Sequence, residues 1–133
     1  MIVIDASIAL SWALQEPENA EAAAVLEYIC DHVAYVPGNF HTEVANGLLQ
    51  AERRKRLSDA EVAEALADVM ALSFVVELPD PQVIVGTART HGLTCYDASY
   101  LALALQIHLP LATADAHLAA AAKAAKCLWK PRG

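Results

Sequence analysis

The sequence predicts a three-layer α/β protein, in which a central parallel β-sheet is flanked by helices on both faces. Short apolar runs, typical of strands buried on both faces, alternate along the chain with longer segments whose apolar residues recur at helical spacing. This alternation is typical of a parallel sheet. Of the 133 residues, 56% are hydrophobic and 19% charged, which favours one globular domain over residues 1–133.

The first predicted strand covers residues 1–4 and ends at Asp5. Ser7 is the expected N-cap of a short apolar helix that reaches Leu14. An Ala-rich second helix is expected next, with Pro17 at a first helical position.

A strand is expected over residues 32–36, before the turn formed by Pro37 and Gly38. The helix that follows has two distinct faces. Its apolar face carries Phe40, Val44 and Leu48, and another face carries Glu43, Asn46 and Gln50.

Two further helices have recognisable start signals. Ser58 and Glu61 have capping-box spacing ahead of a helix that carries Val62, Leu66, Val69 and Met70. A short β-branched run over residues 74–78 predicts a buried strand. Asp80 and Pro81 then start a helix that Gly92 stops.

The last third of the chain continues the alternation. Thr94 and Asp97 again have capping-box spacing, with Asp in place of Glu. A strand over residues 109–113, a helix over 115–125 and a short closing strand over 127–129 complete the pattern. The helix between Asp97 and this strand has an expected buried stripe of Ala98, Leu101, Ala102 and Leu105.

Acidic residues mark strand ends and first turns. Asp5 and Asp115 follow apolar runs, Asp97 opens an apolar helix, and Glu43 lies inside another helix. The carboxyl ends of parallel strands meet at one edge of a sheet, where ligands bind in open α/β proteins. We therefore expect a shared site, although each aspartate alone is equally explained as a helix cap, and Glu43 as part of a solvated face.

Clustered carboxylates repel one another by roughly 4 kcal/mol per pair at about 4 Å and an effective dielectric of 20, so such a site needs cations. An all-oxygen ligand set favours Mg²⁺ or Mn²⁺. A phosphodiester is the substrate that most needs both charge neutralisation and an activated water, so the site predicts metal-assisted phosphodiester hydrolysis. Ser7 and Thr113 are interpreted as caps, a role that is compatible with positioning a water.

Charge limits how such a protein holds RNA. The formal charge is −7, so the general basic field of a nucleic-acid-binding protein is missing, and cations must be supplied locally. The run from Arg53 to Arg56 is one source, though such a run is also typical of a solvated helix end. The three cysteines match neither a disulfide framework nor a zinc site. We expect a cytoplasmic protein with no signal peptide and no membrane span.

Four motifs together resemble the PIN domain, and in particular the VapC toxins of bacterial and archaeal toxin–antitoxin pairs. The order, spacing and total length of the motifs agree over the whole chain. They are Val-Ile-Asp5-Ala-Ser7, Glu43-Val-Ala-Asn46-Gly-Leu, Tyr-Asp97-Ala-Ser-Tyr-Leu-Ala-Leu-Ala and Leu-Ala-Thr113-Ala-Asp115.

The resemblance implies a Mg²⁺- or Mn²⁺-dependent endoribonuclease that forms a homodimer and is inhibited by a cognate VapB-type antitoxin. It further implies that Asp5, Glu43, Asp97 and Asp115 bind metal. Ser7 and Thr113 would support metal-bound water, and Asn46 matches a frequent polar neighbour of the site. Many relatives carry an acid where this chain has His117, which favours chemistry with one metal ion.

Two other functions fit parts of the pattern. An acidic pocket can capture an Arg-bearing segment of a partner without any chemistry. A phosphatase with an aspartyl nucleophile usually has a second Asp two residues after the first, and this chain has Ser7 there. The sequence names neither the RNA nor the antitoxin.

Overall fold

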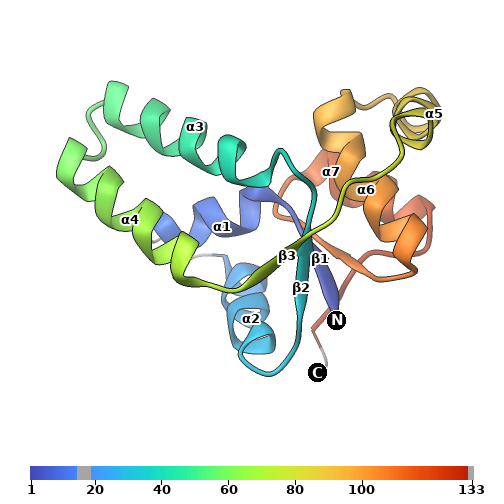
Figure 1. Cartoon of the computed structure of the whole chain (residues 1–133), viewed down its shortest axis with the longest axis horizontal. Helices are drawn as coiled ribbons and strands as arrows, with labels where there is room; N and C mark the ends of the chain where they lie inside the picture. Colours follow the sequence, from blue (N-terminus) through green and yellow to red (C-terminus); the bar gives the residue numbers. More distant parts are fainter. Residues whose placement is uncertain (15–18, 132–133) are drawn as a thin grey trace.

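A computed structural model describes residues 1–14 and 19–131, and its centre is a four-stranded sheet (Figure 1). The strands are β1 (Ile2–Ile4), β2 (Ala34–Val36), β3 (Phe74–Val76) and β4 (Leu111–Ala112). They lie in the order β3-β2-β1-β4, and every neighbouring pair is parallel. The predicted parallel α/β architecture is confirmed.

Helices flank the sheet on both sides (Figure 1). The connections from β1 through β2 to β3 all step in one direction, whereas the return from β3 to β4 steps back across the sheet. Since such crossovers are right-handed, the first four helices lie on one face and the next two on the other. The helices are α1 (Ala6–Ala13), α2 (Ala20–Ile29), α3 (Phe40–Arg53), α4 (Asp59–Ala71), α5 (Pro81–His91), α6 (Cys95–Ile107) and α7 (Ala116–Ala124).

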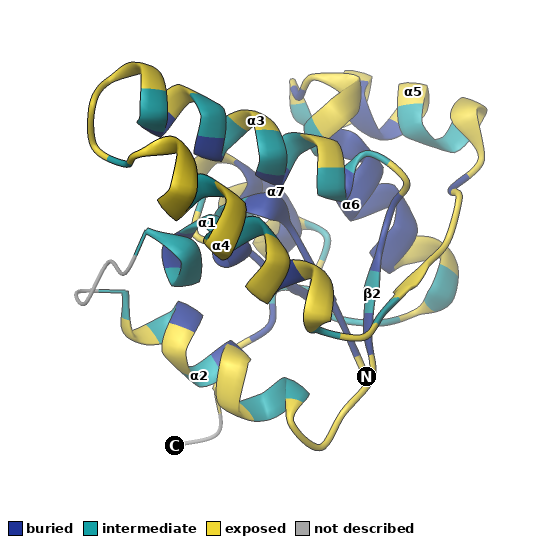
Figure 2. Ribbon diagram, turned by 60° about the vertical axis from the view of Figure 1, so that its left-hand side comes forward, coloured by how far each residue is buried: buried dark blue, intermediate teal, exposed yellow. Residues whose placement is uncertain are grey.

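The core is built around β1 and α6. All three residues of β1 are fully buried, because the strand has neighbours on both edges and helices on both faces. In α6, every residue from Ala98 to Ala104 is buried, as the dark blue ribbon of Figure 2 shows. The expected single stripe was therefore too narrow, and it was wrong at Leu105, which is exposed near the end of the helix.

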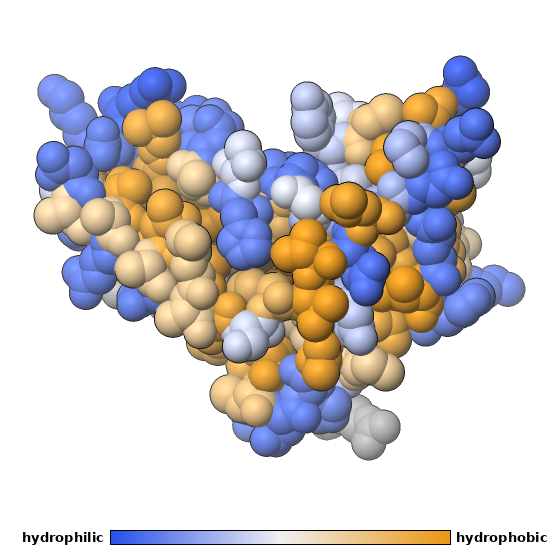
Figure 3. All heavy atoms as spheres, viewed as in Figure 1, coloured by the Kyte–Doolittle hydropathy of each residue, from blue (hydrophilic) through white to orange (hydrophobic). Residues whose placement is uncertain are grey.

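β3 forms an edge of the sheet, so the prediction of a buried strand over residues 74–78 was wrong. Val76 is 50% exposed and Leu78 is 81% exposed. Figure 3 shows apolar atoms gathered over the strands in the middle of this view. A β-branched run favours a strand, but whether another element covers that strand depends on strand order, which local composition does not encode.

Most helix starts follow the predicted capping, although at the start of α6 the structure shows only the Asp97 N–H bond to Thr94 and not the second bond of a capping box. Ser58 and Glu61 form both bonds of a capping box, and Gly92 ends α5 in the left-handed conformation. Ser7, however, lies inside α1, because the helix begins directly after β1 and Asp5 is its N-cap. Pro17 lies outside the described residues, and α2 starts at Ala20 with Asn19 as its cap.

The remaining expectations differ in detail. The closing strand over residues 127–129 is reduced to a single parallel bridge between Leu111 and Leu128. Of the apolar residues expected to face the core from α4, Val69 is buried and Met70 is exposed. None of the helices in the described ranges is long and apolar enough to cross a lipid bilayer.

Candidate active site

The predicted acids occupy the carboxyl edge of the sheet. Asp5 directly follows β1, and Asp115 lies just beyond β4, which pairs with β1. Glu43 lies in the first turn of α3, after β2, and Asp97 lies in the first turn of α6. In Figure 3 the upper surface is notched between the arm formed by α3 and α4 and the opposite lobe formed by α5 and α6. The fold therefore brings four distant positions to one edge.

Asp5 is the most tightly held of these acids. Only 5% of its surface is exposed. Its Oδ1 accepts hydrogen bonds from the Ser7 hydroxyl at 2.6 Å and from the Ile8 N–H at 3.3 Å. Its Oδ2 accepts a 2.6 Å bond from the Thr113 hydroxyl. A carboxylate oxygen accepts about two bonds, so Oδ2 retains capacity for one more partner.

Ser7 and Thr113 form a hydroxyl clamp on Asp5. Each hydroxyl has one proton, and each donates it to the carboxylate. In return, the Ser7 oxygen accepts from the Ala114 N–H at 2.9 Å, and the Thr113 oxygen accepts from the Asp115 N–H at 3.0 Å. The clamp therefore fixes the segment after β4 against the start of α1, with the Asp5 carboxylate between them.

Glu43 is held from another helix. The Tyr100 hydroxyl of α6 donates to Glu43 Oε2 at 2.6 Å, and Asn39 Nδ2 donates a short bond to the same oxygen. The Ser99 hydroxyl lies 3.0 Å from Asn39 Oδ1. Sequence reasoning missed Tyr100 and Asn39 as site residues. The available signal was spacing, because each lies about one helical turn from an acid, Tyr100 from Asp97 and Asn39 from Glu43.

Asp115 is both a helix cap and a member of the acidic cluster. Its Oδ1 accepts from the His117 N–H at 3.1 Å, as expected of an N-cap. Asp97 instead has its own N–H bound to the Thr94 hydroxyl at 3.1 Å, which leaves its carboxylate free of a capping role. Capping and clustering are therefore compatible here. Asn46 is exposed on α3, one turn beyond Glu43.

Three of the acids have raised pKa values, mainly because they are buried and in smaller part because a neighbouring acid is charged. Burial, with a smaller contribution from the charge of Asp115, raises the pKa of Asp5 to about 6 against the opposing effect of its three hydrogen bonds. Burial also raises the pKa of Glu43 and of Asp97. Asp97 adds to the shift at Glu43, and Asp115 adds to the shift at Asp97. The His117 imidazole acts in the opposite direction on Asp97. The four carboxylates are thus linked by electrostatic repulsion, which a nearby cation would relieve.

The donor set suits a hard divalent cation held by few protein ligands. Within residues 1–14 and 19–131, no three acidic, histidine or cysteine side chains are close enough together to hold one ion jointly. Mg²⁺ usually keeps several waters and needs one or two carboxylates. The open acceptor position on Asp5 Oδ2 and the free carboxylate of Asp97 fit that requirement. In their present positions, the side chains of the four acids are too far apart to bind one ion together.

A separate hollow lies between α1, α2 and α4. It is lined by apolar side chains, which include Trp12 and Val69, and by the acidic residues Glu61, Glu64 and Asp68. None of the four clustered acids contributes to it. The molecule therefore has two acidic surfaces, one at the sheet edge and one on the helical side.

Comparison with known proteins places the chain in one protein family. The family model described as PIN domain matches residues 2–124. The chain is 33% identical over 123 residues to the VapC ribonuclease Mb0985 of Mycobacterium bovis, which covers 89% of this chain and 88% of the relative. It is 32% identical over 121 residues to ribonuclease VapC12 of Mycobacterium tuberculosis, with 90% of each chain covered.

Solved structures share the fold. PAE2754 from Pyrobaculum aerophilum superposes with a TM-score of 0.71 at 26% identity, over 90% of this chain and 78% of that one. VapC20 of M. tuberculosis, described as a sarcin–ricin-loop-cleaving toxin, superposes with a TM-score of 0.60 at 15% identity, over 91% and 95% of the two chains. The second likeness concerns the fold alone.

Proposed function

The chain belongs to the PIN-domain family, and we propose that it is a metal-dependent endoribonuclease, the VapC-type toxin of a toxin–antitoxin pair. The observation that carries the proposal is the set of four electrostatically coupled carboxylates at the carboxyl edge of the sheet, with Asp5 oriented by three hydrogen bonds. The similarity to curated VapC ribonucleases over most of the chain supports the same activity.

The role of each residue follows from its environment. A Mg²⁺ or Mn²⁺ ion would supply charge neutralisation at the scissile phosphate and a more acidic water. Asp5 and Asp97 are the proposed direct ligands, and Asp115 and Glu43 extend the negative field that attracts the ion. The clamp of Ser7 and Thr113 fixes the Asp5 oxygens, so the ligand geometry needs little reorganisation. Tyr100 and Asn39 fix Glu43 in the same way.

The decisive experiment is cleavage of a mixed pool of structured RNAs by purified protein in Mg²⁺ or Mn²⁺, compared with EDTA. We expect metal-dependent cutting that falls by about 10²-fold or more in Asp97→Asn, as when one electrostatic stabiliser is lost. Asp68→Asn, which makes the same chemical change on an exposed turn of α4, is the matched control and should cut like the wild type. Wild-type rates in folded Asp97→Asn would contradict the assignment.

The proposed partner is a cognate VapB-type antitoxin. A negative cluster favours a partner segment that carries a basic side chain to the acids, where it would compete with the metal. We expect purified antitoxin to abolish cleavage and to bind Asp97→Asn more weakly than wild-type protein. Equal binding of the two proteins would place the antitoxin contact away from the cluster.

A homodimer in the cytoplasm completes the proposal. Exposed apolar residues such as Val75, Val76 and Leu78 provide a surface that self-association would cover. Light scattering at micromolar concentration should give the mass of two chains. A monomeric mass would remove the dimer from the proposal without affecting the nuclease.

The alternative is a binding module that captures an Arg-bearing segment without chemistry. The raised pKa values of Asp5, Glu43 and Asp97 are compatible with that function as well, because an arginine would relieve the same repulsion. The two functions differ in their need for metal. A module would bind its partner equally well in Mg²⁺ and in chelator, and it would leave RNA intact.

A further inference from the structure

We propose that the outer face of α3 is an RNA-binding track, which holds the phosphate backbone of the substrate between the acid cluster and the cationic end of the helix. The track consists of Asn46, Gln50, Arg53 and Arg54. This inference rests on the proposed ribonuclease function, and it assigns the binding of RNA phosphates to residues outside the acid cluster.

The charge distribution shows where the cations are. The chain carries 9 Lys and Arg residues against 16 Asp and Glu, so most of its surface repels RNA. Four of those cations are consecutive, from Arg53 to Arg56, and all four are exposed. Phosphate binding by this protein therefore has one concentrated source of positive charge, at the end of the arm formed by α3 and α4.

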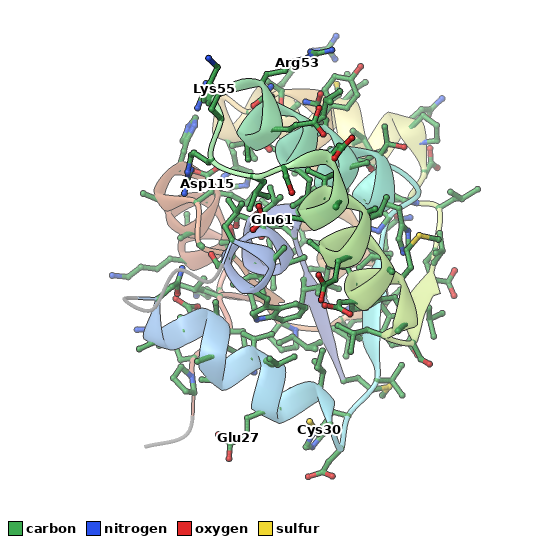
Figure 4. All side chains as sticks on the ribbon, turned by 90° about the vertical axis from the view of Figure 1, so that its left-hand side faces the viewer. Glu27, Cys30, Arg53, Lys55, Glu61 and Asp115 are labelled. Atoms are coloured by element: carbon green, nitrogen blue, oxygen red, sulfur yellow. The ribbon has the colours of Figure 1, made fainter. Side chains whose placement is uncertain are left out.

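The same helix connects that charge to the acid cluster. Glu43 lies in its first turn and Arg53 in its last turn, about 15 Å apart at 1.5 Å per residue. Figure 4 shows Arg53 and Lys55 projecting outward from the upper edge of the molecule, at the opposite end from Glu27 of α2 and from Cys30, which follows that helix. The basic end is therefore accessible on the side of the molecule to which the strands point.

Helical spacing aligns the track. Gln50 lies seven residues after Glu43, close to two full turns, and Arg53 has the same spacing from Asn46. The side chains of Asn46, Gln50 and Arg53 are all exposed. The opposite face is fixed in the core by Phe40, Val44 and Leu48, which are fully buried. The track must therefore face solvent along the whole helix.

No acidic residue lies among the side chains of the track. Between Glu43 and Arg53 the only acidic residue is Glu52. It points at least about 100° around the helix axis from each residue of the track. Asn46 and Gln50 offer neutral amide donors, which are common partners of phosphate oxygens. A phosphate backbone can therefore follow α3 without meeting a negative side chain.

The length of the track defines the kind of RNA that it fits. Phosphates repeat every ~3.4 Å along the axis of a fully stacked strand and lie farther apart in an extended one, so about 15 Å accommodates at most roughly four of them beyond the cut. Contacts of this kind add affinity and fix register, but they carry little sequence information. The track therefore selects for several accessible nucleotides on one side of the scissile bond.

The test measures RNA binding separately from cleavage. The parent protein is the Asp97→Asn variant in Mg²⁺, and the probe is a labelled single-stranded RNA of about 12 nucleotides, which spans α3 at ~3.4 Å per phosphate. In that background, Arg53→Gln with Arg54→Gln removes two cations of the track. Lys123→Gln with Lys126→Gln removes two exposed cations near the end of α7 and is the matched control.

We expect the track variant to weaken RNA binding roughly tenfold and to lower the slope of log K against log salt by about 1.4, because each lost phosphate contact on single-stranded RNA contributes about 0.7. The control pair should change both quantities much less. At the single exposed position Gln50, we expect Gln50→Lys to strengthen binding and Gln50→Glu to weaken it. Circular dichroism should confirm that each variant is folded.

Two results would overturn the inference. If both cation pairs lower RNA affinity and salt slope equally, the effect is one of net charge and the track does not exist. If Gln50→Glu and Gln50→Lys bind alike, the backbone does not pass along α3. A parent protein that binds no RNA would overturn the inference alone if the wild type still cuts RNA with metal, and the proposed nuclease as well if the wild type does not.

Discussion

The hydroxyl of Thr113 donates a 2.6 Å hydrogen bond to Oδ2 of Asp5, although the two residues lie 108 positions apart in the chain. The pairing of β1 with β4 brings them together. Because Ser7 holds the other carboxylate oxygen, both oxygens of Asp5 are oriented before any ligand arrives. The pKa, the stability and the proposed activity of the site are therefore coupled to this contact.

Thr113→Val tests the clamp. The substitution keeps the shape of the side chain but removes the donor to Asp5 and the acceptor of the Asp115 N–H. We expect the free energy of unfolding at neutral pH to fall by about 1–3 kcal/mol, because buried polar groups lose their partners. The pKa of Asp5 should also rise, which would move the acid limb of the cleavage profile to higher pH.

Thr113→Ser is the control for that change, since it keeps the hydroxyl and loses one methyl group. Urea unfolding and pH–rate profiles of the three proteins give the comparison. A Val variant with the unfolding free energy and the pH midpoint of the wild type would show that the contact is energetically unimportant.

The stability of the protein should decrease between about pH 4 and pH 6. The pKa of Asp5 is raised from 3.8 to about 6 by burial, so in this window the folded protein binds a proton that the unfolded chain releases. Proton binding then favours folding, and the free energy of unfolding falls as the pH rises, levelling above the folded pKa. The raised pKa values of Glu43 and Asp97 contribute in the same direction.

Asp5→Asn should remove a large part of this pH dependence. At neutral pH we expect the variant to be more stable than the wild type, on the order of 1–2 kcal/mol, because it no longer buries a charge. This gain exceeds the loss of one hydrogen bond from a hydroxyl, which the amide nitrogen cannot accept. Urea unfolding at a series of pH values measures the effect. A wild-type pH slope in Asp5→Asn would contradict the assignment of the shift to this residue.

Tyr100→Phe should weaken metal binding and lower the free energy of unfolding only slightly. The lost hydroxyl is a donor to Glu43 Oε2, and Asn39 still contacts the same oxygen. We expect a loss of about 1 kcal/mol in unfolding free energy and a further rise in the pKa of Glu43. Tyr96→Phe, on an exposed position of the same helix, is the matched control. Identical Mg²⁺ titrations of the two variants would exclude a positioning role for Tyr100.

Divalent metal should stabilise the folded protein. At about 100 times its dissociation constant a ligand adds about 2.7 kcal/mol, which corresponds to several degrees in Tm. We expect this increase with Mg²⁺ or Mn²⁺ at neutral pH, and a much smaller one at pH 5, where Asp5 is largely protonated. Thermal melts of the wild type and Asp97→Asn provide the measurement. A metal shift of the same size in both proteins would place the ion elsewhere.

Two glycine substitutions should have opposite effects on stability. A Cβ at Gly47 of α3 would lie 2.6 Å from a Leu10 methyl of α1, so Gly47→Ala must displace that side chain. A Cβ at Gly86 of α5 would contact nothing within 4 Å. We expect Gly86→Ala to stabilise by about 0.5–1 kcal/mol through helix propensity and Gly47→Ala to destabilise by about 1 kcal/mol. Denaturant melts that rank the two variants in the reverse order would contradict this packing.

The predictable part of the fold was the part encoded locally. Ser58 with Glu61 and Asp80 with Pro81 started helices as expected, because a cap acts on N–H groups only a few residues away. The fully buried run of β1 followed from its apolar sequence. The acids were also correctly placed at one edge, because parallel strands share their carboxyl ends.

The misjudged elements depended on neighbours distant in the chain. Phe74–Val76 has the composition of an interior strand, yet it lies at an edge, because only the strand order determines which strand is covered. Ser7 has the chemistry of a cap, but the helix begins one residue after β1, so Asp5 caps it and Ser7 clamps Asp5 instead.

By itself, the sequence determined which residues are candidates for the chemistry: Asp5, Glu43, Asp97 and Asp115 were identifiable because charged groups beside apolar runs need a local reason. Tertiary structure alone decided how those charges are held. Tyr100 and Thr113 each donate to an acid from another element. Such partners are set by the packing of α6 and the pairing of β1 with β4, which bring together groups that no local spacing connects.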